Sequence, residues 1–279
     1  MALESHEMNA VTGLNRIWRL VMTGFCFALF GLGGLLLSLT WFNLLLLVVR
    51  DDNKRCRIAR RSISASFRLF LTVARSIGVF DYRIHGADCL RNERGCLVVA
   101  NHPTLIDYVL LASVMPETDC LVKSALLKNP FVSGVIRAAD YLVNSQAETL
   151  LPQCQERLGR GDTILIFPEG TRTEPGKKMS LQRGAANIAV RCRRDLRIVA
   201  ICCSEHLLDK QSKWYDVPHT KPLFEITVRS RVSIDHFYDG KTPEPALAAR
   251  QLNRHLSQQL QFVETPFSGL NDASALPRN

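Results

Sequence analysis

Two short polar motifs contain the residues that could do chemistry, and the first is Asn-His-Pro-Thr-Leu-Ile-Asp at residues 101–107. In this motif His102 precedes Asp107 by five positions. A neutral imidazole can take a proton from a hydroxyl group near neutral pH. It does so better when a carboxylate holds its other ring nitrogen and stabilises the imidazolium. His102 and Asp107 are therefore a candidate general base and the partner that orients it.

The same motif also allows a purely structural interpretation. Pro103 favours a turn, and Thr104 is the expected N-cap of a following helix. Asp107 would then lie in the first helical turn, close enough to reach back to His102. However, Thr104 followed by Asp107 three positions later also resembles a capping box, in which Asp107 only closes the helix. The motif alone leaves both interpretations open.

The second motif, Phe-Pro-Glu-Gly-Thr-Arg at residues 167–172, offers groups that could recognise a charged substrate. Gly170 allows close approach of the backbone to a ligand, and Arg172 can bind a phosphate or carboxylate through two parallel hydrogen bonds. Glu169 can accept a hydrogen bond from a substrate hydroxyl group. The alternative is a strand-ending turn with a surface ion pair between Glu169 and Arg172. Further cations follow closely and make the local field positive, as a phosphorylated acceptor would require: Lys177, Lys178 and Arg183.

Each motif directly follows a short apolar run, at residues 96–100 and 163–167, which predicts a buried strand. Strand-like and helix-like runs alternate along the chain, which is typical of an α/β fold with a mostly parallel sheet flanked by helices. Chemistry in such folds is done at the carboxyl ends of the strands. The expected strands are residues 82–85, 96–100, 120–123, 141–143, 163–167, 197–202 and 223–232. The expected helices are residues 105–114, 126–138, 147–158, 181–190 and 245–262.

The N-terminal region predicts a membrane element, because residues 20–49 contain no charged side chain. A helix of that length would reach about 45 Å, against about 30 Å of bilayer hydrocarbon. It could be one tilted span, or a tight hairpin broken at the glycine-rich residues 31–34 that dips into one leaflet. The length of the run argues against a cleaved signal peptide. A basic cluster at residues 50–61 follows, and the positive-inside rule keeps it and the rest of the chain cytoplasmic.

Residues 58–77 have the spacing of an amphipathic helix, with arginines between the apolar positions. Just after a membrane segment, such a helix could bind an anionic lipid surface. It could equally be a core-facing helix with a solvated side. We therefore expect a membrane-associated helical region at residues 1–78, an α/β domain at residues 79–263 and a flexible tail at residues 264–279.

Composition limits the partners and the compartment. The net charge of +9 favours an anionic partner such as lipid headgroups, a nucleotide-bearing cofactor or nucleic acid. The nine cysteines include no Cys-x-x-Cys pair and no zinc-ligand spacing. We therefore expect reduced thiols in a cytosolic compartment, and no metal site.

Together and in this order, the two motifs resemble those of the glycerolipid acyltransferase family, whose best-known members are the 1-acyl-glycerol-3-phosphate acyltransferases. The resemblance covers residues 82–203. It includes a block between the motifs, with Lys123, Pro130, Gly134 and the expected strand at residues 141–143. The joint occurrence of both motifs makes the resemblance specific.

The resemblance implies a membrane-associated acyltransferase whose active site opens at the cytoplasmic face of the cytoplasmic membrane. His102 would be the general base and Asp107 its partner, so that an acceptor hydroxyl attacks the thioester of acyl-CoA or acyl carrier protein without a covalent enzyme intermediate. The expected partners are membrane lipids and this acyl donor; no other cofactor, no metal and no nucleic acid is expected. The family positions that hold a glycerophosphate acceptor correspond here to Glu169, Gly170, Thr171 and Arg172.

Two departures from the family pattern keep the acceptor open. The family's middle block usually ends in an arginine, where this chain has Asn-Ser-Gln at residues 144–146, and a later Val-Pro-Val-like strand reads Val-Ala-Ile at residues 199–201. We expect transfer to a lysophospholipid, with phosphatidate or a related lipid as product. The alternatives are the same chemistry on a non-glycerophosphate acceptor in a specialised lipid or polyene pathway, a membrane-tethered thioesterase, and a non-catalytic lipid-binding relative. The last is disfavoured because both motifs keep their polar residues.

Overall fold

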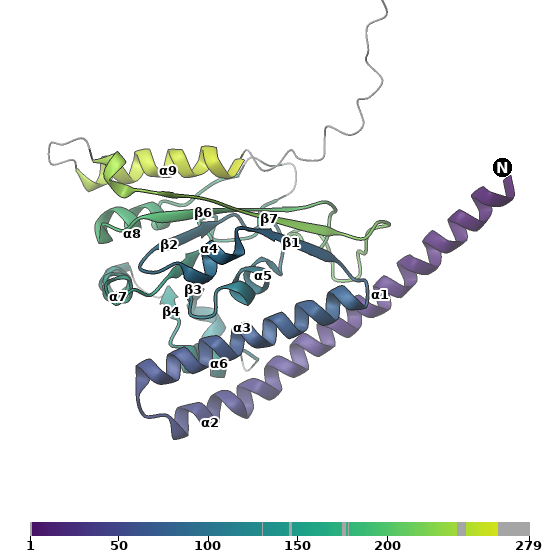
Figure 1. Cartoon of the computed structure of the whole chain (residues 1–279), viewed down its shortest axis with the longest axis horizontal. Helices are drawn as coiled ribbons and strands as arrows, with labels where there is room; N and C mark the ends of the chain where they lie inside the picture. Colours follow the sequence, from purple (N-terminus) through teal and green to yellow (C-terminus); the bar gives the residue numbers. More distant parts are fainter. Residues whose placement is uncertain are drawn as a thin grey trace, which may run out of the picture.

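The computed structural model describes residues 2–129, 131–144, 147–174, 177, 179–238 and 244–261. In this part of the chain the centre is a seven-stranded sheet with the order β1-β7-β6-β2-β5-β3-β4 (Figure 1). Neighbouring strands are parallel except β6 and β7, which are antiparallel. Every expected strand forms, within one residue of its expected bounds. The strands are β1 (Asp81–His85), β2 (Leu97–Ala100), β3 (Asp119–Lys123), β4 (Leu142–Asn144), β5 (Ile164–Ile166), β6 (Leu196–Cys203) and β7 (Leu223–Val232).

Helices cover both faces of the sheet, which confirms the expected fold class. Strand β2 is buried along its whole length because alternate side chains enter two different cores. Leu97 and Val99 pack into the core formed with α7, α8 and α9, whereas Val98 and Ala100 pack into the core formed with α3, α4 and α5. These helices are α3 (Asp52–Ser76), α4 (Ala87–Asn92), α5 (Asp107–Val114), α7 (Ala147–Gly159), α8 (Gly184–Cys192) and α9 (Pro245–Gln261).

Helices α1 (Ala2–Leu39) and α2 (Trp41–Val48) form a long rod along the outer side of α3, away from the sheet (Figure 1). A third apolar core joins this rod to the domain, because Phe42 of α2 packs with Ile63 of α3 and Ile136 of α6 (Ser133–Ala139). One helical stretch of the described residues, Gly13–Val48, is long and apolar enough to cross a membrane, by length and composition alone. Most of this stretch is not buried by the rest of the protein.

The apolar segment does not turn at its glycines. Helix α1 continues through residues 31–34 and ends at Leu39, so the alternative of a hairpin broken at these glycines is wrong. The helix breaks at Thr40, whose hydroxyl donates to the carbonyl oxygen of Leu36 over 2.7 Å. The chain reverses only before α3, where the Asp51 carboxylate accepts from the Lys54 N–H over 3.0 Å and caps the helix.

Helix α3 contains the amphipathic helix expected at residues 58–77, and three of the arginines in that stretch bind protein groups. Arg60 is buried and donates to the Asp119 carboxylate over 2.8 Å. Arg68 donates to the Ser113 carbonyl oxygen over 3.2 Å, and Arg75 pairs with Asp81 over 2.8 Å. This favours the core-facing interpretation of the helix.

The helix expected at residues 126–138 is not one continuous helix. Residues 126–138 form a short 3-10 helix, η1 (Ser124–Lys128), and then α6, because the Asn129 side chain accepts from the Phe131 N–H over 3.0 Å and turns the chain. The other 3-10 helix of the described chain is η2 (Ile234–Phe237).

The expected boundary at residue 78 falls in the turn between α3 and β1. The expected tail at residues 264–279 lies outside the described residues.

Candidate active site

The two motifs meet because the strands that carry them are neighbours. Strands β2 and β5 pair in parallel, with Val99 opposite Ile166, so both chains leave the sheet at the same edge. Asn101 then extends the sheet pattern with its side chain: its amide group exchanges two hydrogen bonds with the backbone of Ile201 in β6, each of 2.7 Å. These two bonds fix Asn101, and so they fix the start of the segment that carries His102.

The His102–Asp107 pair has the geometry of a base and its orienting partner. Nδ1 of His102 lies 2.8 Å from Oδ2 of Asp107, which is fully buried. An ionised carboxylate can only accept, so Nδ1 carries the proton and Nε2 keeps a lone pair. The imidazole is partly exposed and lines a large cavity. Nε2 is therefore the nitrogen that can take a proton from a substrate.

Asp107 also accepts hydrogen bonds from Thr104, as in a capping box, so the catalytic and the structural interpretations of the motif both apply. Its Oδ2 accepts from the Thr104 N–H over 2.7 Å, and its Oδ1 accepts from the Thr104 hydroxyl over 2.6 Å. The helix nevertheless begins at Asp107 with Ile106 at the cap position, so the expected N-cap at Thr104 is wrong. Burial raises the pKa of Asp107, while the hydrogen bonds from His102 and Thr104 oppose this shift.

Glu169 binds the backbone of the first motif. Its Oε1 accepts from the His102 N–H over 2.8 Å, and its Oε2 accepts from the Thr173 hydroxyl over 2.6 Å. Thr173 in turn donates its N–H to the His102 carbonyl oxygen over 2.8 Å. Glu169 is 7% exposed, so both carboxylate oxygens are used inside the protein. Its predicted contact with a substrate hydroxyl would have to compete with these bonds.

The other residues of the second motif line the cavity. Gly170, Thr171 and Arg172 all belong to its wall. Gly170 has φ +69°, a conformation that favours glycine, and a Cβ there would lie 2.7 Å from Nε2 of Gln182. Arg172 donates to the carbonyl oxygens of Leu208 and Asp209 over 3.0 and 2.6 Å.

The expected surface ion pair between Glu169 and Arg172 is not among the ion pairs of the described residues, because each side chain is engaged elsewhere. Lys177 pairs with Glu174, which reduces the positive charge expected beside the motif. Arg183 is exposed at the start of α8, and Lys178 lies outside the described residues.

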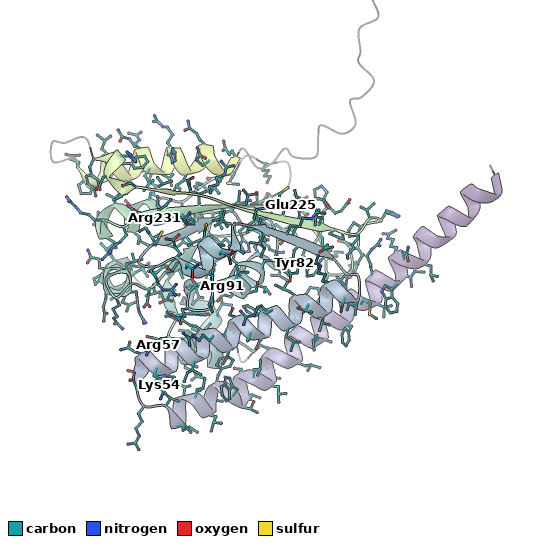
Figure 2. All side chains as sticks on the ribbon, in the orientation of Figure 1. Lys54, Arg57, Tyr82, Arg91, Glu225 and Arg231 are labelled. Atoms are coloured by element: carbon teal, nitrogen blue, oxygen red, sulfur yellow. The ribbon has the colours of Figure 1, made fainter. Side chains whose placement is uncertain are left out.

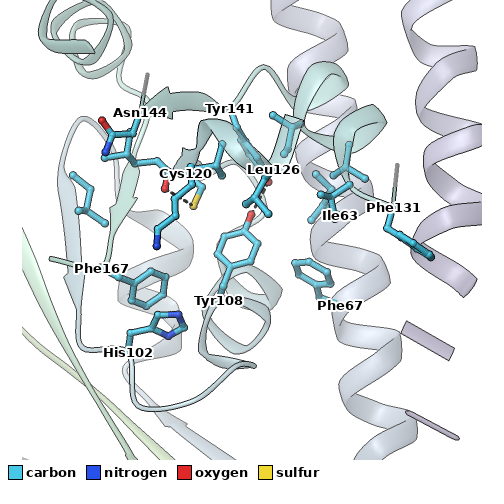
Figure 3. A pocket seen from close by; sticks show the side chains of 18 of the residues that line it. Ile63, Phe67, His102, Tyr108, Cys120, Leu126, Phe131, Tyr141, Asn144 and Phe167 are labelled. Carbon is cyan, nitrogen blue, oxygen red and sulfur yellow. Dashed lines mark hydrogen bonds between the residues drawn. The ribbon is translucent and has the colours of Figure 1, made fainter. Parts of the chain in front are cut away.

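The cavity connects this site to the N-terminal helices. It has a volume of about 1090 Å³, just above the roughly 300–1,000 Å³ common for ligand pockets. From the site it runs past Tyr108 to Ile63 and Phe67 of α3 and to Phe131 (Figure 3). Helix α1 closes it with apolar and glycine residues: Leu29, Phe30, Gly31, Gly33, Gly34 and Leu37.

Three positions in the site had no role in the sequence analysis. Asn101 anchors the first motif to β6, Thr173 ties the two motifs together, and the Phe167 ring stacks on the His102 imidazole with ring centres 4.5 Å apart. Asn101 and Phe167 belong to the first and the second motif, and this membership was the available signal. Thr173 gave none.

The chain is similar to several known proteins. Residues 81–204 match the family described as Acyltransferase, and both motifs lie inside the match. A 1-acyl-sn-glycerol-3-phosphate acyltransferase from Helicobacter pylori is 31% identical over 144 residues, which are 49% of this chain and 56% of the relative. A 1-acyl-sn-glycerol-3-phosphate acyltransferase alpha from Mus musculus is 22% identical over 80% of this chain and 79% of the relative. The crystal structure of the 1-acyl-sn-glycerophosphate acyltransferase PlsC from Thermotoga maritima has a TM-score of 0.62 at 21% identity, and the match covers 89% of this chain and 97% of that one.

The match of residues 81–204 to this family model and the similarity to the Helicobacter pylori relative confirm the resemblance expected from the two motifs. The likeness to PlsC shows a common fold. The chain spans about half of the Helicobacter pylori relative and 39% of a Homo sapiens 1-acyl-sn-glycerol-3-phosphate acyltransferase beta.

Proposed function

We propose that this protein is a membrane-associated acyltransferase that moves a fatty-acyl group from acyl-CoA or acyl carrier protein to the hydroxyl group of a lysophospholipid. The observation that carries the proposal is the His102–Asp107 pair, whose imidazole lines a large and mostly apolar cavity. A base for a hydroxyl group and a space for an acyl chain are thus adjacent. The relatives named 1-acyl-sn-glycerol-3-phosphate acyltransferases support a 1-acyl-glycerol-3-phosphate acceptor and phosphatidate as product.

The geometry supports a direct transfer. The acceptor hydroxyl gives its proton to Nε2 of His102 while its oxygen attacks the thioester carbonyl carbon. Asp107 stabilises the imidazolium through Nδ1. The tetrahedral intermediate then expels the thiolate, which takes the proton from His102, and the ester product forms. No side chain of the protein is acylated in this scheme.

Arg172 is the residue we assign to the acceptor phosphate. Among the described residues, only its terminal nitrogen Nη1 is used to hold Leu208 and Asp209, so the rest of its guanidinium group remains for a ligand. Lys123 lines the same cavity and adds a second cation. The side chains of Arg172 and Lys123 can therefore both pair with a negatively charged headgroup at the cavity wall.

A non-phosphate acceptor is the second candidate, favoured by Asn144. This residue ends β4, lines the cavity and pairs in register with Lys123. It begins the segment where related chains usually have an arginine, and an amide binds a phosphate less strongly than a guanidinium group. An acceptor in a specialised lipid or polyene pathway would meet a less positive wall at this place.

The N-terminal rod is the part we assign to the membrane, lying along the bilayer surface. Arg19, near its start, donates to the carbonyl oxygen of Pro218 over 3.1 Å, and Ser38, near its end, accepts from the Gly134 N–H over 3.2 Å. Both ends of the apolar stretch thus touch the same domain, so a full crossing would separate one of them from it. Exposed apolar side chains along the rod can enter the lipid: Leu14, Ile17, Val21, Leu32, Leu36, Leu47 and Val48.

Basic residues lie where this rod ends. Figure 2 shows Lys54 and Arg57 at the end of the rod where α2 turns into α3. Both are exposed, so they can contact anionic headgroups. This arrangement would hold the domain, and the mouth of its cavity, on the cytoplasmic face of the cytoplasmic membrane.

The test is a transfer assay on the purified full chain in lipid vesicles. Labelled acyl-CoA and acyl carrier protein are offered with lysophosphatidate, with a neutral monoacylglycerol and without acceptor, and the products are identified by mass spectrometry. We expect phosphatidate from the wild type and none from His102→Ala. His206→Ala is the matched control, because His206 forms a second His–Asp pair, with Asp209, that is not part of the cavity wall. Equal release of free fatty acid with and without acceptor would instead identify a thioesterase.

A further inference from the structure

A pair of tyrosine hydroxyl groups is an unusual feature in this mostly apolar cavity. Tyr108 of α5 and Tyr141, just before β4, have their hydroxyl oxygens 2.8 Å apart, and both residues line the cavity. The side chains around them include Ile63, Phe67 and Leu126 (Figure 3). The pair is thus a polar spot away from the His102–Asp107 site, and the transfer chemistry does not use it.

The hydrogen bonding of this pair is incomplete. Two hydroxyl groups contain two protons, and the bond between Tyr108 and Tyr141 uses one of them. Among the described residues, no third polar group bonds either hydroxyl. Tyr141 is 8% exposed, and burial raises the pKa of both tyrosines, so neither loses its proton near neutral pH. A buried O–H donor without a partner needs a ligand or water to complete it.

The pair lies on the path of a bound acyl chain. Figure 3 shows Tyr108 between His102 and Phe67. The Tyr108 ring meets the Phe67 ring edge-on, with centres 5.8 Å apart and an angle of 85°, and Phe67 stacks with Phe30 of α1 at 6.1 Å. A chain that starts with its thioester at His102 therefore passes the two hydroxyl groups before it reaches the N-terminal helices.

We propose that Tyr108 and Tyr141 form a binding subsite for an oxygen function, a hydroxyl or keto group, on the acyl chain of the donor. The inference rests on the proposed acyl transfer and specifies its substrate class. The free O–H of the pair donates to the substrate oxygen, and the remaining lone pairs can accept from a substrate hydroxyl. A chain without this oxygen leaves the buried donor unpaired and binds less well.

Removing the two tyrosine hydroxyl groups should not detach β4 from the sheet, because a second hydrogen bond holds it. The Asp119 carboxylate accepts from the Leu142 N–H over 3.2 Å and so fixes the start of β4 without the tyrosines. Tyr238 offers a matched change elsewhere, because its hydroxyl donates to the Val190 carbonyl oxygen over 2.7 Å and it is not part of the cavity wall. Tyr238→Phe removes a hydrogen-bonded tyrosine hydroxyl outside the cavity.

The experiment measures kcat/KM for donors of one chain length that carry a hydroxyl group at successive positions, relative to the unsubstituted chain. For the wild type we expect kcat/KM to be about fivefold higher when the hydroxyl group is at one particular position of the chain. This ratio corresponds to the free energy of one hydrogen bond between neutral groups. Tyr108→Phe, Tyr141→Phe and the double variant should flatten this profile, while Tyr238→Phe keeps it. The double variant leaves no unpaired hydroxyl, so it separates loss of the subsite from loss of folding.

Each outcome decides between the two proposals. A flat profile for the wild type, or a preferred position that survives in the double variant, would overturn the subsite alone. No acyl transfer from any donor, on CoA or on carrier protein, would overturn the proposed function and the subsite with it. A preferred position that disappears only when Tyr108 or Tyr141 is changed supports both.

Discussion

The backbone N–H of His102 donates a hydrogen bond to the carboxylate of Glu169 over 2.8 Å. The second motif therefore holds the first, although the resemblance assigns Glu169 to the acceptor. Thr173 completes this connection through its hydroxyl and its N–H. Glu169 is thus placed to position the base, and its effect on catalysis can be separated from any contact with substrate.

Asp107→Asn should lower kcat about 100- to 10,000-fold, because the amide cannot stabilise the imidazolium of His102. The assay is transfer at saturating donor and acceptor. Thr104→Val is the control, since it removes only the hydroxyl that donates to Asp107 over 2.6 Å and leaves the His102 contact in place. Wild-type kcat in Asp107→Asn would show that the base needs no carboxylate partner.

Glu169 should make stability depend on pH. Burial raises its pKa above the usual 4.5, so the folded protein keeps this proton to higher pH than the unfolded chain. Its contribution to the free energy of unfolding is therefore largest below pH 4.5 and is lost as pH rises through the folded-state pKa. Denaturant unfolding between pH 4 and 7 should show a smaller decline in Glu169→Gln than in the wild type.

Glu174 supplies the control for this pH dependence. Lys177 and Lys210 lower its pKa to about 2, so its contribution changes only below pH 4.5 and with the opposite sign. Glu174→Gln should therefore follow the wild-type slope between pH 4.5 and 7. If both variants changed that slope equally, the assignment of the decline to Glu169 would fail.

Arg172→Ala should raise the KM for lysophosphatidate at least about tenfold and leave the KM for a neutral acceptor nearly unchanged, because the guanidinium group pairs with the phosphate. Since Arg172 also holds Leu208 and Asp209, thermal unfolding must be measured on the same samples. Lys210→Ala is the control for a nearby cation outside the cavity wall. An equal effect on both acceptors would favour the non-phosphate candidate.

Asp119→Ala should reduce the free energy of unfolding by about 3–5 kcal/mol, because it removes the nearer counter-charge of the buried Arg60 and leaves only Asp162, 3.9 Å away. It also removes the acceptor for the N–H groups of Cys120 and Leu142. Denaturant unfolding in detergent measures the change. Asp88→Ala breaks an exposed pair with Arg91 and should have no measurable effect.

Leu32→Asp combined with Leu36→Asp should reduce binding to lipid vesicles in a flotation assay, because both side chains are more than 60% exposed on the rod. Neither lines the cavity, so activity on soluble short-chain substrates should persist. Leu247→Asp is the matched control, as Leu247 is exposed on α9, across the sheet from the rod. Equal loss of binding in all variants would point to unfolding.

The sequence predicted the central strands well because β2 and β5 are short apolar runs that are buried between two helical layers. It also predicted that His102 and Asp107 could meet, since five positions across a turn bring them together. The bonds of Glu169 to His102 and of Asp119 to Arg60 join distant parts of the chain, and no local pattern indicates such partners. The break at Thr40 was missed because the neighbouring glycines were the stronger helix-breaking signal.

Helix α1 both carries exposed apolar side chains and forms one wall of the reaction cavity, with Gly134 of α6 packed so closely on Ser38 that a Cβ there would lie 2.5 Å from its hydroxyl oxygen. Under the proposed function, lipid attachment and the shape of the acyl-chain cavity therefore depend on the same helix. Exchange of residues 1–49 between two such enzymes would transfer donor preference along with membrane affinity. Removal of the same residues would open the cavity to water instead of giving a smaller soluble enzyme.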